Sequence, residues 1–188
     1  MKILAINRIL GQSVDITNNH LSIIPDSAII RGGKPFFVPG FSGKWEYQAT
    51  IAYRVTRLGK NIAAKFAHRY IDALALAVYT KPIDFIDKVG QSAIASAFDG
   101  AFIIGDWIPL EQFDKDAAIS IDFDGNNTSL SLSQLAIEDT IADISKYLTL
   151  KIGDIIAPAI IPITGDIAIN TIVNGSINNT PNIKLKFK

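Results

Sequence analysis

The chain has 188 residues, of which 48% are hydrophobic and 19% are charged, and it contains no cysteine. Lysine plus arginine and aspartate plus glutamate both total 18, which gives a formal net charge of zero. This composition excludes an intrinsically disordered chain, a disulfide-bonded scaffold and a thiolate metal site. Balanced charge provides no general attraction to nucleic acid or to an anionic membrane, so we expect neither partner. The sequence has no apolar run near the roughly 18 residues of a membrane span, and its N-terminus is too short and polar for a signal sequence. We therefore expect a single cytoplasmic domain over residues 1–188.

The N-terminal half of the sequence predicts strands joined by turns. In the segment 45–55 alternate residues share one face of a strand, so Glu46, Gln48 and Thr50 are expected to point the same way. Apolar side chains recur every fourth residue between 62 and 70, which predicts a helix over 62–71. The other predicted elements of this half are an irregular loop over 11–27 and strands over 2–6, 28–31, 34–39, 45–55 and 73–80.

The C-terminal half predicts a hairpin, a helix and further strands. Asp124-Gly125 lies between two alternating segments, 118–123 and 128–133, which is a strong signal for a β-hairpin. An apolar stripe with helical spacing predicts a helix over 133–148. The remaining elements are an unassigned connecting segment over 84–97 and strands over 102–104, 107–109 and 155–163, with two more strands within 165–188. The pattern indicates a β-rich α+β fold with two or three short helices.

One motif, Ser96–Ile108, resembles a known active-site signature. The signature is K-S-F-D-x-x-x-P-x-G-x-W-I/V of the fumarylacetoacetate hydrolase family, but the position of its lysine holds Ser96 and that of its proline holds Ile103. The framework of the motif is retained while its reactive group is changed. The matching positions are Phe98, Asp99, Gly105, Trp107 and Ile108.

The resemblance extends along most of the chain. Lys2–Arg8 resembles the opening strand of the family and the arginine that follows it. Arg31 falls at a position where the family has a lysine, and Lys34–Pro39 resembles the family's next strand, which is bounded by prolines. Leu148–Ile156 and Gly165-Asp166 resemble two of its later turns. Membership implies a mixed β-sandwich roll, usually a homodimer, in which Mg²⁺ chelates a 2-oxo acid or a 1,3-dicarbonyl substrate.

The family's metal ligands are an E-x-E pair and a later aspartate, and the resemblance places neutral residues at these positions. The pair aligns with Gln48 and Thr50, and the third ligand aligns with Tyr79 or, one residue later, Thr80. Mg²⁺ prefers charged oxygen ligands, so we expect no bound metal or other cofactor. The family's catalytic histidine position falls in Gly11–Ser13, and His20 in the same loop does not match the spacing. Weak alternative metal ligands are Glu46, Asp84 and Asp99.

Basic and neutral side chains are left to line the former active site. We expect a neutral-to-basic cavity that binds a small carboxylate or phosphate directly. The expected cavity residues are Arg8, Arg31, Gln48, Thr50, Tyr79, Thr80, Lys81 and Ser96.

Three functions agree with these residues. The leading interpretation is a degenerate member of the family that lacks metal-dependent catalysis and binds a small carboxylate. The first alternative is an active hydrolase, isomerase or decarboxylase on 2-oxo acids or acylpyruvates with rebuilt metal coordination. The second alternative is an interaction or scaffold domain whose cavity is filled with side chains.

Overall fold

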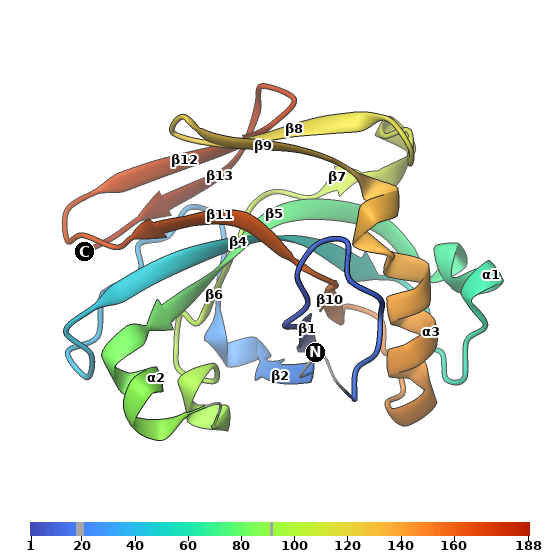
Figure 1. Ribbon diagram of the computed structural model, residues 1–188, viewed down its shortest axis with the longest axis horizontal. Coiled ribbons are helices and arrows are strands. Elements are labelled where there is room, and N and C mark those ends of the chain that lie inside the picture. The colour runs from blue at the N-terminus through green and yellow to red at the C-terminus, as the bar shows by residue number, and fades with distance from the viewer. Residues whose placement is uncertain (18–20, 91) are drawn as a thin grey trace.

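Two β-sheets pack face to face, and the longest helix lies against one end of the layer between them (Figure 1). The computed structural model describes residues 1–17, 21–90 and 92–188. The larger sheet contains nine strands and the smaller sheet contains four. The predicted β-rich α+β class is confirmed. No helix in these described ranges is long and apolar enough to cross a bilayer.

The larger sheet is mixed, with the strand order β2-β1-β10-β4-β5-β6-β3. Strand β1 pairs in parallel with β10, and β3 pairs in parallel with β6, whereas the other pairs are antiparallel. Two further strands join this path, because β11 pairs with β4 and β7 pairs with β5. The strands are β1 (Lys2–Ile6), β2 (Leu21–Pro25), β3 (Ile29–Ile30), β4 (Trp45–Val55), β5 (Ile71–Pro82), β6 (Phe102–Ile104), β7 (Ile108–Pro109), β10 (Ile155–Ala157) and β11 (Ile160–Asp166).

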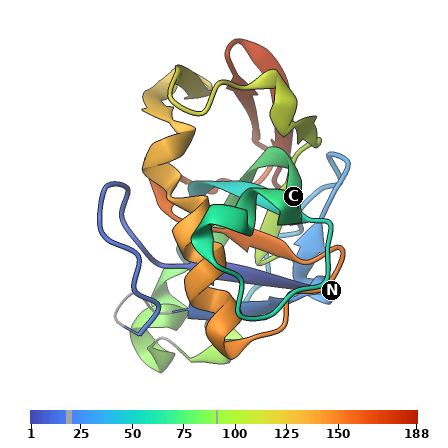
Figure 2. The same ribbon diagram turned by 90° about the vertical axis from the view of Figure 1, so that its right-hand side faces the viewer.

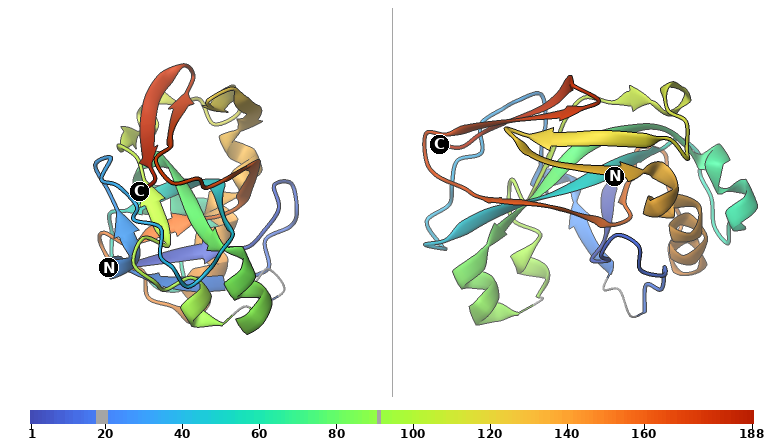
Figure 3. Two further views of the ribbon diagram at one scale, coloured as in Figure 1. Left: turned by 90° about the vertical axis from the view of Figure 1, so that its left-hand side faces the viewer. Right: turned by 45° about the horizontal axis from the view of Figure 1, so that its top comes forward.

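The smaller sheet consists of two antiparallel hairpins in the order β13-β12-β8-β9 and lies above the larger sheet (Figure 3). Both hairpins close with two residues of positive φ, Asp124 and Gly125 at 48° and 92° and Asn178 and Asn179 at 49° and 63°. This geometry is that of a type I′ turn, and it explains why the Asp-Gly pair predicted the first hairpin. The strands are β8 (Ala118–Phe123), β9 (Asn126–Ser131), β12 (Ile172–Ile177) and β13 (Thr180–Lys186).

In the part of the chain that the structure describes, three α-helices accompany the sheets: α1 (Ala64–Ala67), α2 (Ile83–Val89) and α3 (Ile137–Tyr147). Helix α3 buries Ile137, Ile141 and Ile144 against the core, and α1 lies beside it (Figure 2). Helix α2 lies at the opposite end of the molecule, directly after β5. Short 3₁₀ turns occur at Asp26–Ala28, His68–Tyr70, Ala93–Ala95, Leu110–Gln112 and Leu132–Leu135.

The two faces of the larger sheet bury separate cores. On β4 the odd-numbered residues from Trp45 to Val55 point into the larger core between the sheets, as the period of two requires. Ala52 on the other face joins a smaller core with Ala75 and Ala77 of β5, around which the larger sheet curls (Figure 3). Gln48 and Thr50 share the face of Ala52, so they lie on the side of the smaller core.

Two predictions for the N-terminal region are wrong. The expected loop over 11–27 contains strand β2, which among the described residues pairs only with β1 and exposes Ile23, so its weak alternation is that of an edge strand. His20, in the same segment, lies outside the described residues. The expected strand over 34–39 is reduced to a bridge from Phe36 to Phe187, with backbone hydrogen bonds at Phe36 and Val38, because the prolines at both ends limit its length.

Other elements differ from the predictions in length. The expected strand over 155–163 is divided into β10 and β11, since Pro158 has no N–H to continue the ladder. The helix expected over 62–71 contains only α1 and one 3₁₀ turn, and Ile62 donates its N–H to the hydroxyl of Ser145 instead. The helix expected over 133–148 begins later, because Ala136 adopts a left-handed φ of 49°.

Candidate functional site

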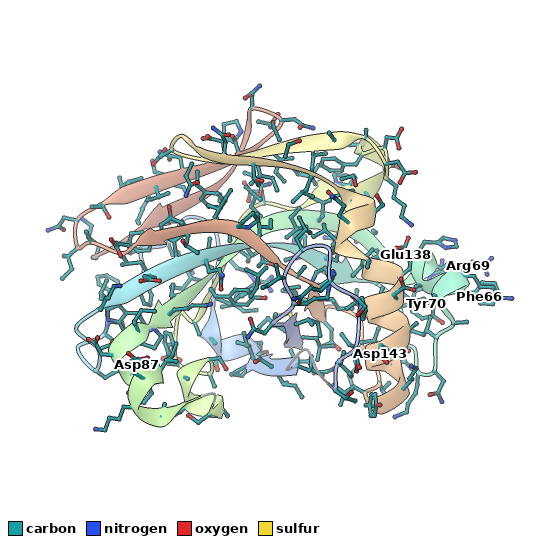
Figure 4. The ribbon with its side chains drawn as sticks, in the orientation of Figure 1. Phe66, Arg69, Tyr70, Asp87, Glu138 and Asp143 are labelled. Atoms are coloured by element: carbon teal, nitrogen blue, oxygen red, sulfur yellow. The ribbon has the colours of Figure 1, made fainter. Side chains whose placement is uncertain are left out.

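A cavity of about 270 Å³ adjoins the smaller core, between β1, β2, the ends of β4 and β5, and helix α2. Helix α2 and the turn Ala93–Ala95 cover it on one side, and Figure 4 marks α2 by Asp87. Its apolar walls are Ala5, Ile6, Ile24, Ile83, Ile86, Ala95, Ala101 and Ile160. Its polar side chains are Asn7, Ser22, Gln48, Tyr79, Thr80, Lys81, Ser92 and Ser96.

The structure brings five of the expected cavity residues together, namely Gln48, Tyr79, Thr80, Lys81 and Ser96. They come from β4, from β5 and from the segment after α2. Neighbouring strands pair Gln48 with Tyr79, and Lys81 is two residues further along the same face of β5. The sheet register therefore makes this group of side chains.

Lys81 carries the only charge among the described residues that line the cavity. Its ammonium group donates a hydrogen bond to the side-chain oxygen of Gln48. Glu46 lies opposite Lys81 in the strand register, but its carboxylate pairs with Lys44 at 2.8 Å. Burial lowers the pKa of Lys81, and the negative charge of Glu46 opposes that shift. The cavity therefore holds a partly desolvated cation whose hydrogen-bond acceptor is neutral.

Tyr79 and Thr80 form the adjoining part of the wall. The Tyr79 ring packs edge-on against Phe102, with 5.3 Å between centroids. Its hydroxyl is buried and has no hydrogen-bond partner of acceptable geometry in the described part of the chain. Burial raises the pKa of Tyr79, and the nearby Thr50 hydroxyl opposes this shift. The Thr80 hydroxyl donates to the carbonyl oxygen of Gly100 at 2.8 Å, so Thr80 is already satisfied.

Thr50 and Arg8 do not line the cavity. The fully buried Thr50 donates its hydroxyl to the carbonyl oxygen of Ala159 at 2.8 Å. The guanidinium of Arg8 is also buried, and it donates to three backbone carbonyl oxygens at 2.6 to 3.1 Å. Burial lowers the pKa of Arg8, and Asp139 opposes the shift. The three carbonyl oxygens that accept hydrogen bonds from Arg8 belong to Gln12, Leu135 and Pro158. Arg8 therefore joins distant segments of the backbone.

Arg31 and the three expected alternative metal ligands also lie outside the cavity. Arg31 is exposed, and its nearest partner is the sulfur of Met1 at 3.4 Å. Asp84 accepts the backbone N–H groups of Gly43 and Lys44 at 2.9 and 2.8 Å. Asp99 is exposed, and Glu46 is held by the ion pair described above. No carboxylate of the described residues lines the cavity.

Residues of the motif Ser96–Ile108 fix the position of the backbone beside the cavity. Phe98 packs edge-on against both Phe41 and Trp45, with centroid distances of 5.4 and 5.5 Å. A Cβ on Gly105 would come within 2.4 Å of the carbonyl oxygen of Asn182, so only glycine fits there. These residues hold the backbone in place, whereas Ser96, at the position of the motif's lysine, faces the cavity.

The cavity also contains residues that the sequence analysis missed. Ser22 belongs to β2, which was assigned to a loop, and Ile83 and Ile86 belong to α2, which was left unassigned. Pro82 before α2 and the acidic Asp84 in its first turn are the available signals of a helix start. The helix has only seven residues, too few for a clear apolar stripe.

A second hollow, of about 390 Å³, lies near α1 and α3 at the opposite end of the molecule from α2. Figure 4 labels Phe66 and Arg69 near α1 and Glu138 on α3. The wall of this second hollow includes His68 and an ion pair between Lys115 and Glu138, in which the lysine nitrogen and a carboxylate oxygen are 2.8 Å apart. Lys65 and Asp139 add one charge of each sign to the same wall, so the formal charges of the lining lysine, glutamate and aspartate side chains sum to zero.

The residues of the main cavity do not fit the Mg²⁺ that the family resemblance implies. Mg²⁺ requires near-octahedral oxygen ligands and is usually held by carboxylates. Gln48, Tyr79 and Thr80, which line the cavity at positions aligned with the family's ligands, are neutral, and the ammonium of Lys81 would repel a cation beside Gln48. Within the described ranges, no three histidine, cysteine, aspartate or glutamate side chains form a group that could hold a metal.

Comparison with known proteins gives one family and one fold. The sequence profile described as "Fumarylacetoacetate (FAA) hydrolase C-terminal" matches residues 14–159. A search of curated proteins gives no match.

Similar solved structures include two isomerases and one hydrolase. The 5-carboxymethyl-2-hydroxymuconate delta-isomerase from Mycobacterium smegmatis is 19% identical with a TM-score of 0.84, and the match covers 99% of this chain and 78% of that chain. The 2-hydroxyhepta-2,4-diene-1,7-dioate isomerase from Mycobacterium marinum is 18% identical with a TM-score of 0.84, and the match covers 99% of this chain and 73% of that chain. The fumarylpyruvate hydrolase from Pseudomonas aeruginosa, in complex with Mn²⁺ and pyruvate, is 17% identical with a TM-score of 0.81. The match covers 100% of this chain and 89% of that chain. At these identities the likeness shows the fold alone.

Proposed function

Because the chain belongs to the fumarylacetoacetate hydrolase family, we propose that its cavity binds a small carboxylate without metal-dependent catalysis. The observation that carries this proposal is the ammonium group of Lys81, which lines the cavity and has the neutral Gln48 as its hydrogen-bond acceptor. A partly desolvated cation attracts an anion more strongly than an exposed lysine does. The hydroxyl groups of Ser22 and Ser92 line the cavity and can donate to the second oxygen of the ligand, whereas the hydroxyl of Ser96 donates to the carbonyl oxygen of Ala93 at 3.4 Å.

The charge of the cavity supports direct binding over metal-mediated binding. In a metal site, carboxylates hold the cation and the cation holds the substrate. Here the positive charge belongs to Lys81, and the nearby acidic side chains have other partners. Glu46 pairs with Lys44, and Asp84 accepts two backbone N–H groups. A lysine thus supplies the charge that a metal would otherwise bring.

The size of the cavity supports a ligand of a few carbon atoms. Pockets for drug-sized molecules have volumes of about 300 to 1,000 Å³, and this one is smaller, at about 270 Å³. The structure of the Pseudomonas aeruginosa hydrolase contains pyruvate, which has suitable size and charge for a first test. An open cavity also counts against the alternative of a scaffold domain with a filled cavity.

The proposal is tested by calorimetry on protein treated with a chelator. We expect pyruvate to bind metal-free protein and to lose most of its affinity in Lys81→Met. The matched control is Lys88→Met, which removes an exposed lysine of α2 that does not line the cavity. Pyruvate binding that requires added Mg²⁺ or Mn²⁺ would overturn the proposal. Failure of every tested small carboxylate to bind would do the same.

The homodimer that the family resemblance implies stays a prediction. Light scattering coupled to size-exclusion chromatography measures the mass in solution directly. A mass of twice 20.4 kDa would agree with a homodimer, and a mass of 20.4 kDa at working concentrations would contradict a homodimer.

A further inference from the structure

We infer that Lys81 forms a covalent imine with the carbonyl carbon of a 2-oxo acid bound in the cavity. The inference rests on the proposed carboxylate site and names the ligand class more narrowly. A lysine that lines a cavity, where the carbonyl group of a bound ligand would lie close to its amine, is the arrangement that imine formation requires.

The surroundings of Lys81 favour its use as a nucleophile. Ile83, Ile86 and Ile160 line the same cavity and limit the hydration of the amine. A lysine in a buried ion pair is held as an ammonium by its partner, but the hydrogen-bond acceptor of Lys81 is an amide oxygen. Glu46 is the charged group that faces Lys81 across the strands, and it is paired with Lys44.

The position of Lys81 also suits a ligand that carries two functional groups. A 2-oxo acid has a carboxylate and a carbonyl on adjacent carbon atoms, so one end can be held while the other reacts. Ser92 lies on the covering segment after α2, and Ser22 lies on β2. These hydroxyl groups can donate to the carboxylate while the amine meets the neighbouring carbonyl carbon.

The reaction balances without an oxidant, a reductant or a metal. The ammonium of Lys81 first loses one proton, and the nitrogen lone pair forms a bond to the carbonyl carbon as the carbon–oxygen π bond breaks. The carbonyl oxygen then leaves as water, and it takes two of the three protons that the ammonium carried. The product is a protonated imine with one proton on nitrogen, so the positive charge beside Gln48 is preserved.

The test is reductive trapping in the presence of pyruvate. Cyanoborohydride reduces a protonated imine to a stable secondary amine, and the protein then gains the mass of one pyruvic acid less one oxygen atom. We expect one such adduct per chain and expect peptide mapping to place it on Lys81. Lys81→Arg keeps the positive charge but removes the nucleophilic amine, so no adduct should form at position 81. Lys88→Arg is the matched control and should be trapped as the wild type is.

The outcomes separate the inference from the proposal on which it rests. Calorimetric binding of pyruvate without trapping on Lys81 would overturn the imine and leave the carboxylate site intact. Adducts spread over exposed lysines, at the same level in Lys81→Arg, would also overturn the imine. Absence of binding and of trapping would overturn both. Propionate, which lacks the carbonyl group, should bind and should not be trapped.

Discussion

Lys81 donates its hydrogen bond diagonally to Gln48 on β4, although Glu46 is the residue directly opposite it in the strand register. Opposite charges at directly paired positions usually attract each other. Here Lys44, immediately before the strand, pairs with the carboxylate of Glu46 at 2.8 Å. The side chain of Lys81 is therefore directed into the cavity. The charge of the site thus depends on which of two lysines Glu46 binds.

Substitution of Gln48 by glutamate should weaken ligand binding. Gln48→Glu keeps the size of the side chain and gives Lys81 a carboxylate partner, which would raise the pKa of Lys81 and repel an anionic ligand. We expect the affinity for pyruvate to fall at least about tenfold, which corresponds to about 1.4 kcal/mol. Calorimetry measures the change, and Gln112→Glu, on an exposed turn, is the control for an added charge. Unchanged or tighter binding in Gln48→Glu would contradict the role given to Lys81.

Removal of Arg8 should affect stability and leave the binding site intact. Arg8→Ala deprives three buried or partly buried backbone carbonyl groups of their donor, and each such loss costs about 1–3 kcal/mol. We expect the free energy of unfolding, measured with urea, to fall by at least about 3 kcal/mol. Arg31→Ala removes an exposed arginine and should change the free energy of unfolding by less than about 0.5 kcal/mol. If folded Arg8→Ala lost affinity for pyruvate, Arg8 would have to be assigned to the site after all.

Asn182 should be one of the most sensitive polar residues of the core. Its side-chain oxygen accepts the N–H of Leu76 and its amide nitrogen donates to the carbonyl of Asp106, both at 2.7 Å. Asn182→Ala leaves both backbone groups unpaired and should lower the free energy of unfolding by at least about 2 kcal/mol. The control Asn127→Ala lies in an exposed part of β9 and should stay within about 0.5 kcal/mol of the wild type in the same urea titration. Equal effects of the two substitutions would show that the bridge made by Asn182 contributes little.

Local patterns in the sequence predicted the elements that depend on local interactions. Strand β4 was predicted with its observed bounds, because its residues alternate between two faces over its whole length. The first hairpin followed from Asp124-Gly125, which supplies the two positive φ angles of the turn. Edge strand β2 was missed because it is paired on one side only and exposes Ile23, so it lacks the signal of a buried strand.

The arrangement of the site depended on contacts that no local pattern contains. The family resemblance gave the register that brings Gln48, Tyr79 and Lys81 together. The resemblance could not predict where the Arg8 side chain points. Two of the carbonyl groups that accept hydrogen bonds from Arg8, on Pro158 and Leu135, are 150 and 127 residues away in the chain. Long side chains select among distant partners, so their placement requires the tertiary structure.

Thermal unfolding should respond to pyruvate and should not respond to divalent cations. A ligand present at 100 times its Kd stabilises the folded state by about 2.7 kcal/mol. At about 2–4 °C per kcal/mol for a chain of this size, saturating pyruvate should raise Tm by about 5–10 °C. Millimolar Mg²⁺ or Mn²⁺ should leave Tm unchanged, alone or with pyruvate, because the cavity offers neutral oxygens beside the ammonium of Lys81. In Lys81→Met the response to pyruvate should disappear. A rise in Tm with Mn²⁺ that chelator reverses would contradict the metal-free site, and a further rise with pyruvate only in the presence of Mn²⁺ would restore the metal-dependent alternative.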